Sequence, residues 1–263
     1  MAAVPLNQIL CGDCLDLLGL FPEAGVDLIL TAPPPADGRR HSLAPASAAY
    51  VAWLLPRVAQ FRRVLKPGGT LLLVMKENVV NGERHTYVLE LIQALRAQGW
   101  RWTEEYVWHK TNGPPGKLPA RLHDGWERCL QFNLAAEYAW YPDAVRTPRA
   151  ERPRPVRREE APTAPALVYP HNVLTLPAEG NRRVATFPLE LPRWFVQLFT
   201  REGEVVLDPF CGTGTTAIAA RQLRRRYVGI EIDPQLVRFA RETLEPPPRP
   251  GEHDLLLPGL DGR

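Results

Sequence analysis

The chain has 263 residues, 45% of them apolar, a formal net charge of +3 and a sequence pI near 8.7. This is enough apolar sequence for one full core, and the charge permits nucleic-acid binding without requiring it. No apolar run is long enough for a membrane helix, and the first residues lack a signal-peptide pattern. The cysteines are too few and too scattered for a disulfide framework, and the C-x-x-C pair of Cys11 and Cys14 has no second pair at ligand spacing. The composition therefore predicts a cytoplasmic protein without a membrane partner or a metal site.

The first two predicted strands each lead into a short loop segment. Residues Asn7–Cys11 predict a strand, after which Gly12 and Asp13 turn the chain. The apolar run Val26–Leu30 predicts a buried strand that continues directly into Thr31-Ala32-Pro33-Pro34-Pro35. Ligands of open α/β sheets bind at the carboxyl ends of parallel strands, so this rigid segment is a candidate site. The structural alternative is a proline-capped loop, because the chain contains 28 prolines.

Three helices and another strand are expected in the middle of the chain. A helix is predicted over Tyr50–Leu65, ended by Lys66-Pro67-Gly68-Gly69, with a strand at Thr70–Met75. Further helices are predicted over His85–Gln98 and over Pro192–Thr200, the last with proline in its first turn.

An arginine-rich stretch lies between these elements. Six arginines stand among prolines between Arg146 and Arg158. One interpretation is a solvated, poorly ordered loop. The functional alternative is a DNA-facing segment whose arginines contact phosphates.

The stretch Val205–Thr216 has the sequence VVLDPFCGTGTT, and it predicts a strand, a tight turn and the start of a helix. Gly212 and Gly214 allow the turn, and the helix is expected over Thr215–Gln222. Backbone N–H groups and the positive end of the helix dipole then face a ligand.

A second strand, Tyr227–Ile230, is expected to follow that helix and ends at Glu231. This acid stands about twenty residues beyond the glycine turn, where a carboxylate commonly binds ribose hydroxyls. Together the turn and the acid predict a nucleoside cofactor, while a glycine turn alone is often structural.

Two motifs resemble those of a known enzyme family. The sequence D-P-F-x-G-x-G-T from Asp208 resembles the S-adenosylmethionine loop of DNA amino-methyltransferases. Thr31–Pro35 resembles T-S-P-P-Y, the catalytic motif of cytosine-N4 methyltransferases, and it precedes the cofactor loop, as in the beta class. The resemblance covers about 7–244 and implies an α/β, Rossmann-like fold with a mostly parallel twisted sheet, helices on both faces and permuted motif order.

The resemblance also implies site residues. The catalytic candidates are Thr31, Ala32, Pro33, Pro34 and Pro35. The S-adenosylmethionine candidates are Asp13, Cys14, Phe187, Asp208, Pro209, Phe210, Gly212, Thr213, Gly214, Thr215, Glu231 and Ile232. The DNA-binding candidates are Arg39, Arg40, Lys110, Lys117, Arg121, Arg149 and Arg152.

The catalytic motif departs from the family at two positions. Ala32 replaces a serine (an aspartate in adenine-directed relatives), and Pro35 replaces a tyrosine. A hydrogen-bond acceptor for the amine and an aromatic ring for the flipped base are thereby absent. The Thr31 hydroxyl is not expected to substitute, because side chains alternate along a strand. We therefore expect an intact cofactor pocket with catalysis weakened or lost.

The leading functional prediction is a site-specific DNA methyltransferase that modifies the N4 amine of a flipped-out cytosine, in a restriction–modification setting. Alternatives are an adenine-N6 methyltransferase, a catalytically inactive homologue that binds S-adenosylmethionine and DNA, and an RNA or small-molecule methyltransferase. The expected partners are double-stranded DNA, a cognate restriction endonuclease and a second copy of the chain, and the expected location is cytoplasmic and nucleoid-associated.

The expected organisation has four parts. Residues 1–110 form the catalytic half, 111–168 an inserted DNA-facing region that is partly disordered near 146–166, 169–245 the cofactor-binding half, and 246–263 a flexible tail.

Overall fold

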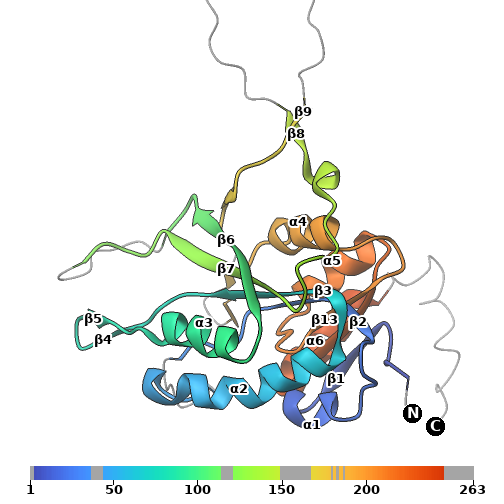
Figure 1. The fold of residues 1–263 in the computed structure, drawn as a ribbon, viewed down its shortest axis with the longest axis horizontal. Helices are drawn as coiled ribbons and strands as arrows, with labels where there is room; N and C mark the ends of the chain where they lie inside the picture. Colours follow the sequence, from blue (N-terminus) through green and yellow to red (C-terminus); the bar gives the residue numbers. More distant parts are fainter. Residues whose placement is uncertain are drawn as a thin grey trace, which may run out of the picture.

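The computed structural model describes residues 3–36, 44–113, 121–148, 167–178, 180–181, 184–185 and 187–245. Within these residues the main sheet has eight strands in the order β1-β14-β13-β2-β3-β7-β6-β10. Figure 1 shows this sheet at the centre of the molecule, with helices around it. Neighbouring strands in the stretch β1-β14-β13-β2-β3 pair in parallel, and β7 is antiparallel to both of its neighbours, β3 and β6. This confirms the expected α/β class with a mostly parallel sheet.

The main sheet consists of β1 (Gln8–Cys11), β2 (Val26–Thr31), β3 (Leu65–Met75), β6 (Arg101–Lys110), β7 (Trp126–Asn133), β10 (Val173–Leu176), β13 (Val205–Asp208) and β14 (Arg226–Glu231). Short pairs are formed by β4 (Val79–Val80) with β5 (Glu83–Arg84), β8 (Thr147–Pro148) with β9 (Leu167–Val168), and β11 (Gly180–Asn181) with β12 (Val184–Ala185). The helices are α1 (Cys14–Leu18), α2 (Ser47–Val64), α3 (Tyr87–Ala97), α4 (Glu190–Phe199), α5 (Thr215–Gln222) and α6 (Pro234–Leu244), with a 3₁₀ turn at Pro142–Val145.

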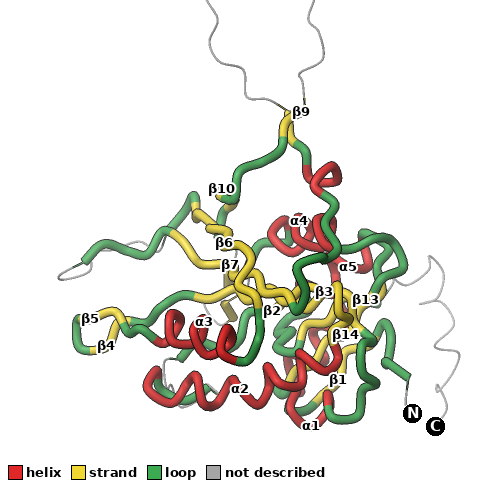
Figure 2. Tube along the Cα trace, viewed as in Figure 1, coloured by secondary structure: helices red, strands yellow, loops and turns green. Residues whose placement is uncertain are grey.

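Helices cover both faces of the sheet, as the tube view makes clear (Figure 2). Side chains of α1, α2 and α3 share one buried apolar cluster with one face of the sheet, and those of α4, α5 and α6 share a second cluster with the other. All six residues of β2 are buried, because this strand lies between both clusters. In the described part of the chain, no helix is both long and apolar enough to cross a bilayer.

Strands from opposite ends of the chain lie side by side in the sheet. β1 pairs in parallel with β14, from Gln8 with Val228 to Cys11 with Glu231. The neighbouring β13 pairs with both β14 and β2. The permuted order of motifs is therefore compatible with one continuous sheet, since each strand needs its neighbours in space rather than in sequence.

Two boundaries differ from the sequence-based expectations. β3 begins at Leu65, so Lys66-Pro67-Gly68-Gly69 lies inside the strand instead of ending the helix. The pairing with β2 shifts register at this stretch, since Val26 pairs with Leu65 and Leu28 with Thr70, and this irregularity accommodates the additional residues of β3. Residues 126–133, grouped with the inserted region, form β7 within the main sheet. The predicted tail at 246–263 and most of the 146–166 stretch lie outside the described residues.

Candidate active site

The predicted loops meet at one edge of the sheet. β14, β13 and β2 are consecutive parallel strands, so their carboxyl ends lie side by side. The hydroxyl of Thr31, the last residue of β2, donates to Asp208 Oδ1 at the end of β13 over 2.6 Å. After the end of β1, the Gly12 N–H donates to the Glu231 carbonyl at 2.9 Å. Segments 177 residues apart in sequence therefore contact each other directly.

The glycine loop after β13 has the backbone that the sequence predicts. Gly212 has φ 52° and Gly214 has φ 87°, in the left-handed region that favours glycine. Apart from Gly212 and its two chain neighbours, no heavy atom of the described residues lies within 4 Å of a Cβ built on Gly212. Gly214 is the N-cap residue of α5, and because glycine has no side chain, it makes no capping hydrogen bond to the first N–H groups of the helix. The loop thus presents open space beside a helix N-terminus, which favours an electron-rich ligand.

Glu231 fixes the other side of this loop. Its Oε2 accepts the Gly212 N–H at 2.9 Å, and its Oε1 accepts the N–H groups of Ile232 and Asp233 at 2.9 and 3.0 Å. The side chain is half-buried, so the carboxylate is held in place and still reaches solvent. Charged acceptors of this kind bind the hydroxyls of a ribose.

Asp208 faces the protein interior and not the open side of the loop. It is 3% exposed and accepts from the hydroxyls of Thr31 and Thr216, each at 2.6 Å, and from the Phe210 N–H at 3.1 Å. Burial raises the pKa of its carboxyl to about 6, although these hydrogen bonds oppose the rise. The structure therefore gives Asp208 a part in shaping the loop. The other predicted loop residues are Pro209, which is buried, and Thr213, Thr215 and Ile232, which are half-buried.

Asp13 and Cys14 lie at the start of α1. Asp13 Oδ1 accepts the Leu15 N–H at 2.8 Å, and Oδ2 pairs with Arg57 Nη2 at 2.7 Å. Both carboxylate oxygens thus have partners within the chain. Burial raises the pKa of Cys14 to about 12, so its thiol stays protonated at neutral pH.

Sequence reasoning missed two residues of α2 that connect Asp13 to the glycine loop. The Arg57 guanidinium lies 4.3 Å from the ring centroid of Trp53, and that ring lies 5.9 Å from Phe210. Arg57 is 8% exposed, and its Nη1 donates to the Trp53 carbonyl. The spacing of a helical pattern identifies α2 but carries no signal that a charged side chain on it is buried.

The proline segment, residues 32–35, is held by hydrogen bonds of the residues on either side of it. Thr31 is fully buried and donates to Asp208 before the segment, and the Ser47 hydroxyl donates to the Ala36 carbonyl after it at 3.1 Å. Ala32 and Phe187 both pack against the apolar cluster on the α4 side of the sheet. The Thr31 hydroxyl is engaged by Asp208 and is therefore unsuited to replace the serine that Ala32 lacks.

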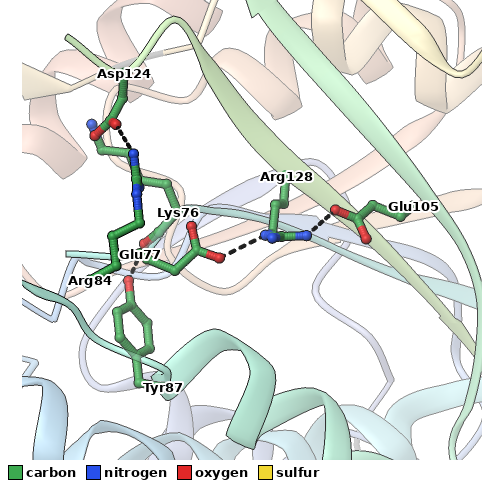
Figure 3. A network of polar contacts seen from close by, with 7 residues as sticks. All are labelled: Lys76, Glu77, Arg84, Tyr87, Glu105, Asp124 and Arg128. Carbon is green, nitrogen blue, oxygen red and sulfur yellow. Dashed lines mark hydrogen bonds and ion pairs between the residues drawn. The ribbon is translucent and has the colours of Figure 1, made fainter. Parts of the chain in front are cut away.

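The basic candidates that the structure describes are paired with acids. Lys110 binds Glu127 at 2.6 Å, and Arg121 binds Asp124 at 2.7 Å. Asp124 also binds Arg84, as Figure 3 shows, so this carboxylate has two cationic partners. The remaining candidates, Arg39, Arg40, Lys117, Arg149 and Arg152, lie outside the described residues.

The network in Figure 3 also connects the end of β3 to β6 and β7. Arg128 donates to Glu77 at 2.8 Å and to Glu105, and Glu77 is 9% exposed. These carboxylates pull the pKa of Arg128 upward against the effect of its burial, so the guanidinium stays charged. The network therefore ties the residue that follows β3 to the two strands that continue the sheet on the side away from β2.

A family model described as DNA methylase matches residues 26–242, which contain the proline segment, the glycine loop and Glu231. The chain belongs to the DNA methylase family. It is 28% identical to the type II methyltransferase M.XycI of Xanthomonas campestris pv. cyanopsidis, with 89% of this chain and 86% of that protein covered. It is 27% identical to the type II methyltransferase M.Cfr9I of Citrobacter freundii, over the same shares of each chain.

Solved structures share the fold. The cytosine-N4-specific PvuII DNA methyltransferase superposes with a TM-score of 0.73 at 23% identity, covering 94% of this chain and 88% of that one. A protein from Thermus thermophilus, assigned as a DNA modification methylase and solved with S-adenosyl-L-methionine, superposes with a TM-score of 0.67 at 27% identity. This alignment covers 90% of this methylase and 92% of that chain. The Rossmann-like methyltransferase fold predicted from the motifs is confirmed.

Proposed function

We propose that this methylase transfers a methyl group from S-adenosylmethionine to the exocyclic N4 amine of a cytosine in DNA. The observation that carries the proposal is the 2.6 Å hydrogen bond between Thr31 and Asp208. It joins the residue before the proline segment to the first residue of the glycine-loop motif. A methyl donor bound at one loop and a nucleobase bound at the other are then neighbours.

The residues present fit the cofactor. Glu231 offers a fixed carboxylate for the ribose, and Gly212 leaves open space beside the N-terminus of α5. Phe210, half-buried beside Trp53, offers an apolar surface at the same loop. S-adenosylmethionine supplies a reactive methyl on a sulfonium centre, so the protein's task is binding and orientation.

At the proline segment, we propose that backbone carbonyls accept the amine hydrogens of an extruded base. The amine lone pair of cytosine is delocalised into the ring, and such acceptors favour a geometry in which the nitrogen can attack. Ala32 adds no polar side chain and Pro35 no aromatic ring. We therefore propose that the methylase works at a reduced rate.

Cytosine N4 is preferred over adenine N6 because position 32 carries no acid, the residue of adenine-directed relatives. The presence of Ala32 and Pro35 favours a second candidate function, in which the chain binds S-adenosylmethionine and DNA without transferring a methyl group.

Transfer of tritium from labelled S-adenosylmethionine to DNA tests the proposal, with Glu231→Ala as the control that removes the ribose acceptor. We expect label in N4-methylcytosine after hydrolysis of the DNA. Label in N6-methyladenine, label only in RNA, or binding of both ligands without any transfer would each contradict the cytosine assignment. We also propose a cognate endonuclease that shares the target site and a homodimer, which sequencing of methylated host DNA and light scattering respectively test.

A further inference from the structure

The Asp208 carboxylate is a junction between the two halves of the candidate site. Its Oδ1 accepts from Thr31 Oγ1 at 2.6 Å and from the Phe210 N–H at 3.1 Å, and its Oδ2 accepts from Thr216 Oγ1 at 2.6 Å. All three bonds are short enough to be well formed.

The donors come from two different loops. Phe210 and Thr216 flank the glycine turn, one before it and one in the first turn of α5. Thr31 ends β2 and is followed at once by the proline segment. In the backbone ladder between β2 and β13, Leu28 pairs with Val206 and Ile29 pairs with Leu207. The bond from Thr31 to Asp208 therefore joins the strands beyond that ladder, at the point where the loops diverge.

A carboxylate in this position is costly to the fold. Asp208 is 3% exposed, and in the described part of the chain no cation pairs with it. A buried charge balanced only by hydroxyls and one N–H is less favourable than a well-packed apolar residue. The arrangement instead fixes the geometry of both loops, because a carboxylate can accept from several directions at once.

We infer that Asp208 is a positioning residue with two separable tasks: through Thr216 and Phe210 it shapes the cofactor loop, and through Thr31 it sets where the proline segment stands relative to that loop. This inference rests on the proposed function and deepens it. It assigns Thr31 to alignment of the target base and Thr216 to cofactor binding, although both hydroxyls bind the same carboxylate.

The matched pair Thr31→Val and Thr216→Val tests the division. Each substitution is close in shape and removes one hydroxyl bond of the same 2.6 Å length from the same buried carboxylate. In Thr31→Val we expect kcat for methyl transfer to fall about tenfold while the Kd for S-adenosylmethionine changes by less than about threefold. In Thr216→Val we expect that Kd to rise about tenfold. Thr31→Ser and Thr216→Ser retain the hydroxyl and should recover most of each loss.

A measurement without catalysis separates failure of this inference from failure of the proposed function. In hydrogen–deuterium exchange of the free protein, Thr31→Val should increase exchange in residues 28–36 and leave 209–216 unchanged, and Thr216→Val should do the reverse. Identical exchange patterns in the two variants, or equal changes in Kd and kcat, would overturn the division of tasks. The expected exchange patterns in a protein that transfers no methyl would support the division and reject the proposed activity. If a valine variant does not fold, the alanine variant at the same position is measured in its place.

Discussion

The loop after β13 and the loop after β2 start from adjacent strand ends but are built from different chemistry. The β13 loop has left-handed glycines, a helix N-terminus, and the carboxylates of Asp208 and Glu231, which are hydrogen-bonded to its backbone. The β2 loop has an anchored residue at each end, Thr31 and Ala36, and between them only alanine and proline. Under the proposed function, side chains therefore hold the cofactor loop in place, while only backbone groups of residues 32–35 are offered to the target base.

This difference indicates that, apart from the Asp208 carboxylate that both loops share, the two loops are held by separate contacts. Loss of polar side chains after β2 leaves the glycine loop intact, because that loop is held by Asp208, Thr216 and Glu231. A methylase of this design would keep cofactor affinity while its transfer rate changes.

The largest effect is expected from restoring the side chains that the β2 loop lacks. Ala32→Ser combined with Pro35→Tyr should raise kcat/KM for DNA methylation close to a thousandfold, which corresponds to about 4 kcal/mol of transition-state stabilisation. The serine acceptor would contribute about 3 kcal/mol and the stacking ring about 1 kcal/mol. Single-turnover methylation kinetics measure this, with Ala32→Ser alone as the control for the first contribution. A double variant that binds both ligands without gaining rate would show that this loop does not receive the base.

The next effect concerns the cofactor side. Glu231→Ala removes a charged acceptor proposed for the ribose, and the Kd for S-adenosylmethionine should rise about a hundredfold, or about 3 kcal/mol. Isothermal titration calorimetry measures the change, and Glu231→Gln, which keeps an oxygen acceptor, should lose less. DNA affinity should remain near that of the parent. An equal loss of DNA binding would mean that the two loops are not independent.

A pH dependence of stability is expected from Asp208. Folding raises the pKa of this carboxyl from 3.8 to about 6, so the native state binds more protons than the unfolded state between these values. The contribution to stability is full below pH 3.8 and is lost as the pH rises through 6. Relative to Asp208→Asn, which does not titrate, the parent should lose about 2 kcal/mol in the free energy of unfolding between pH 4 and 7. Urea unfolding across this range measures it, and parallel profiles for the two proteins would refute it.

The smallest effect concerns the backbone of the glycine loop. Gly214→Ala places a Cβ at φ 87° and 3.1 Å from Ala240 Cβ, and it should lower the free energy of unfolding by about 1 kcal/mol. Gly68→Ala is the control, since its Cβ would meet nothing within 4 Å among the described residues. Denaturant unfolding compares the two variants, and equal stabilities would show that the loop tolerates a side chain at its helix cap.

The sequence predicted the elements that carry short-range signals. The helix at Thr215–Gln222 was predicted at its observed limits, because glycines before it and an apolar pattern within it are local features. The strands at Asn7–Cys11 and Tyr227–Ile230 were also predicted from their apolar runs, and the structure shows that they pair in parallel. Lys66-Pro67-Gly68-Gly69 was predicted to end the preceding helix, because proline and glycine favour a break there. Only the pairing with β2, with its shift in register, reveals that this stretch lies inside β3.

By itself, the sequence determined the family, the order of motifs, and the two departures at Ala32 and Pro35, because residue identity and spacing along the chain are sufficient for these. Tertiary structure decided which side chains contact each other: Thr31 with Asp208, Asp13 with Arg57, and Arg128 with both Glu77 and Glu105. These contacts join residues far apart in the chain, and their energies depend on burial and direction, which no local pattern encodes.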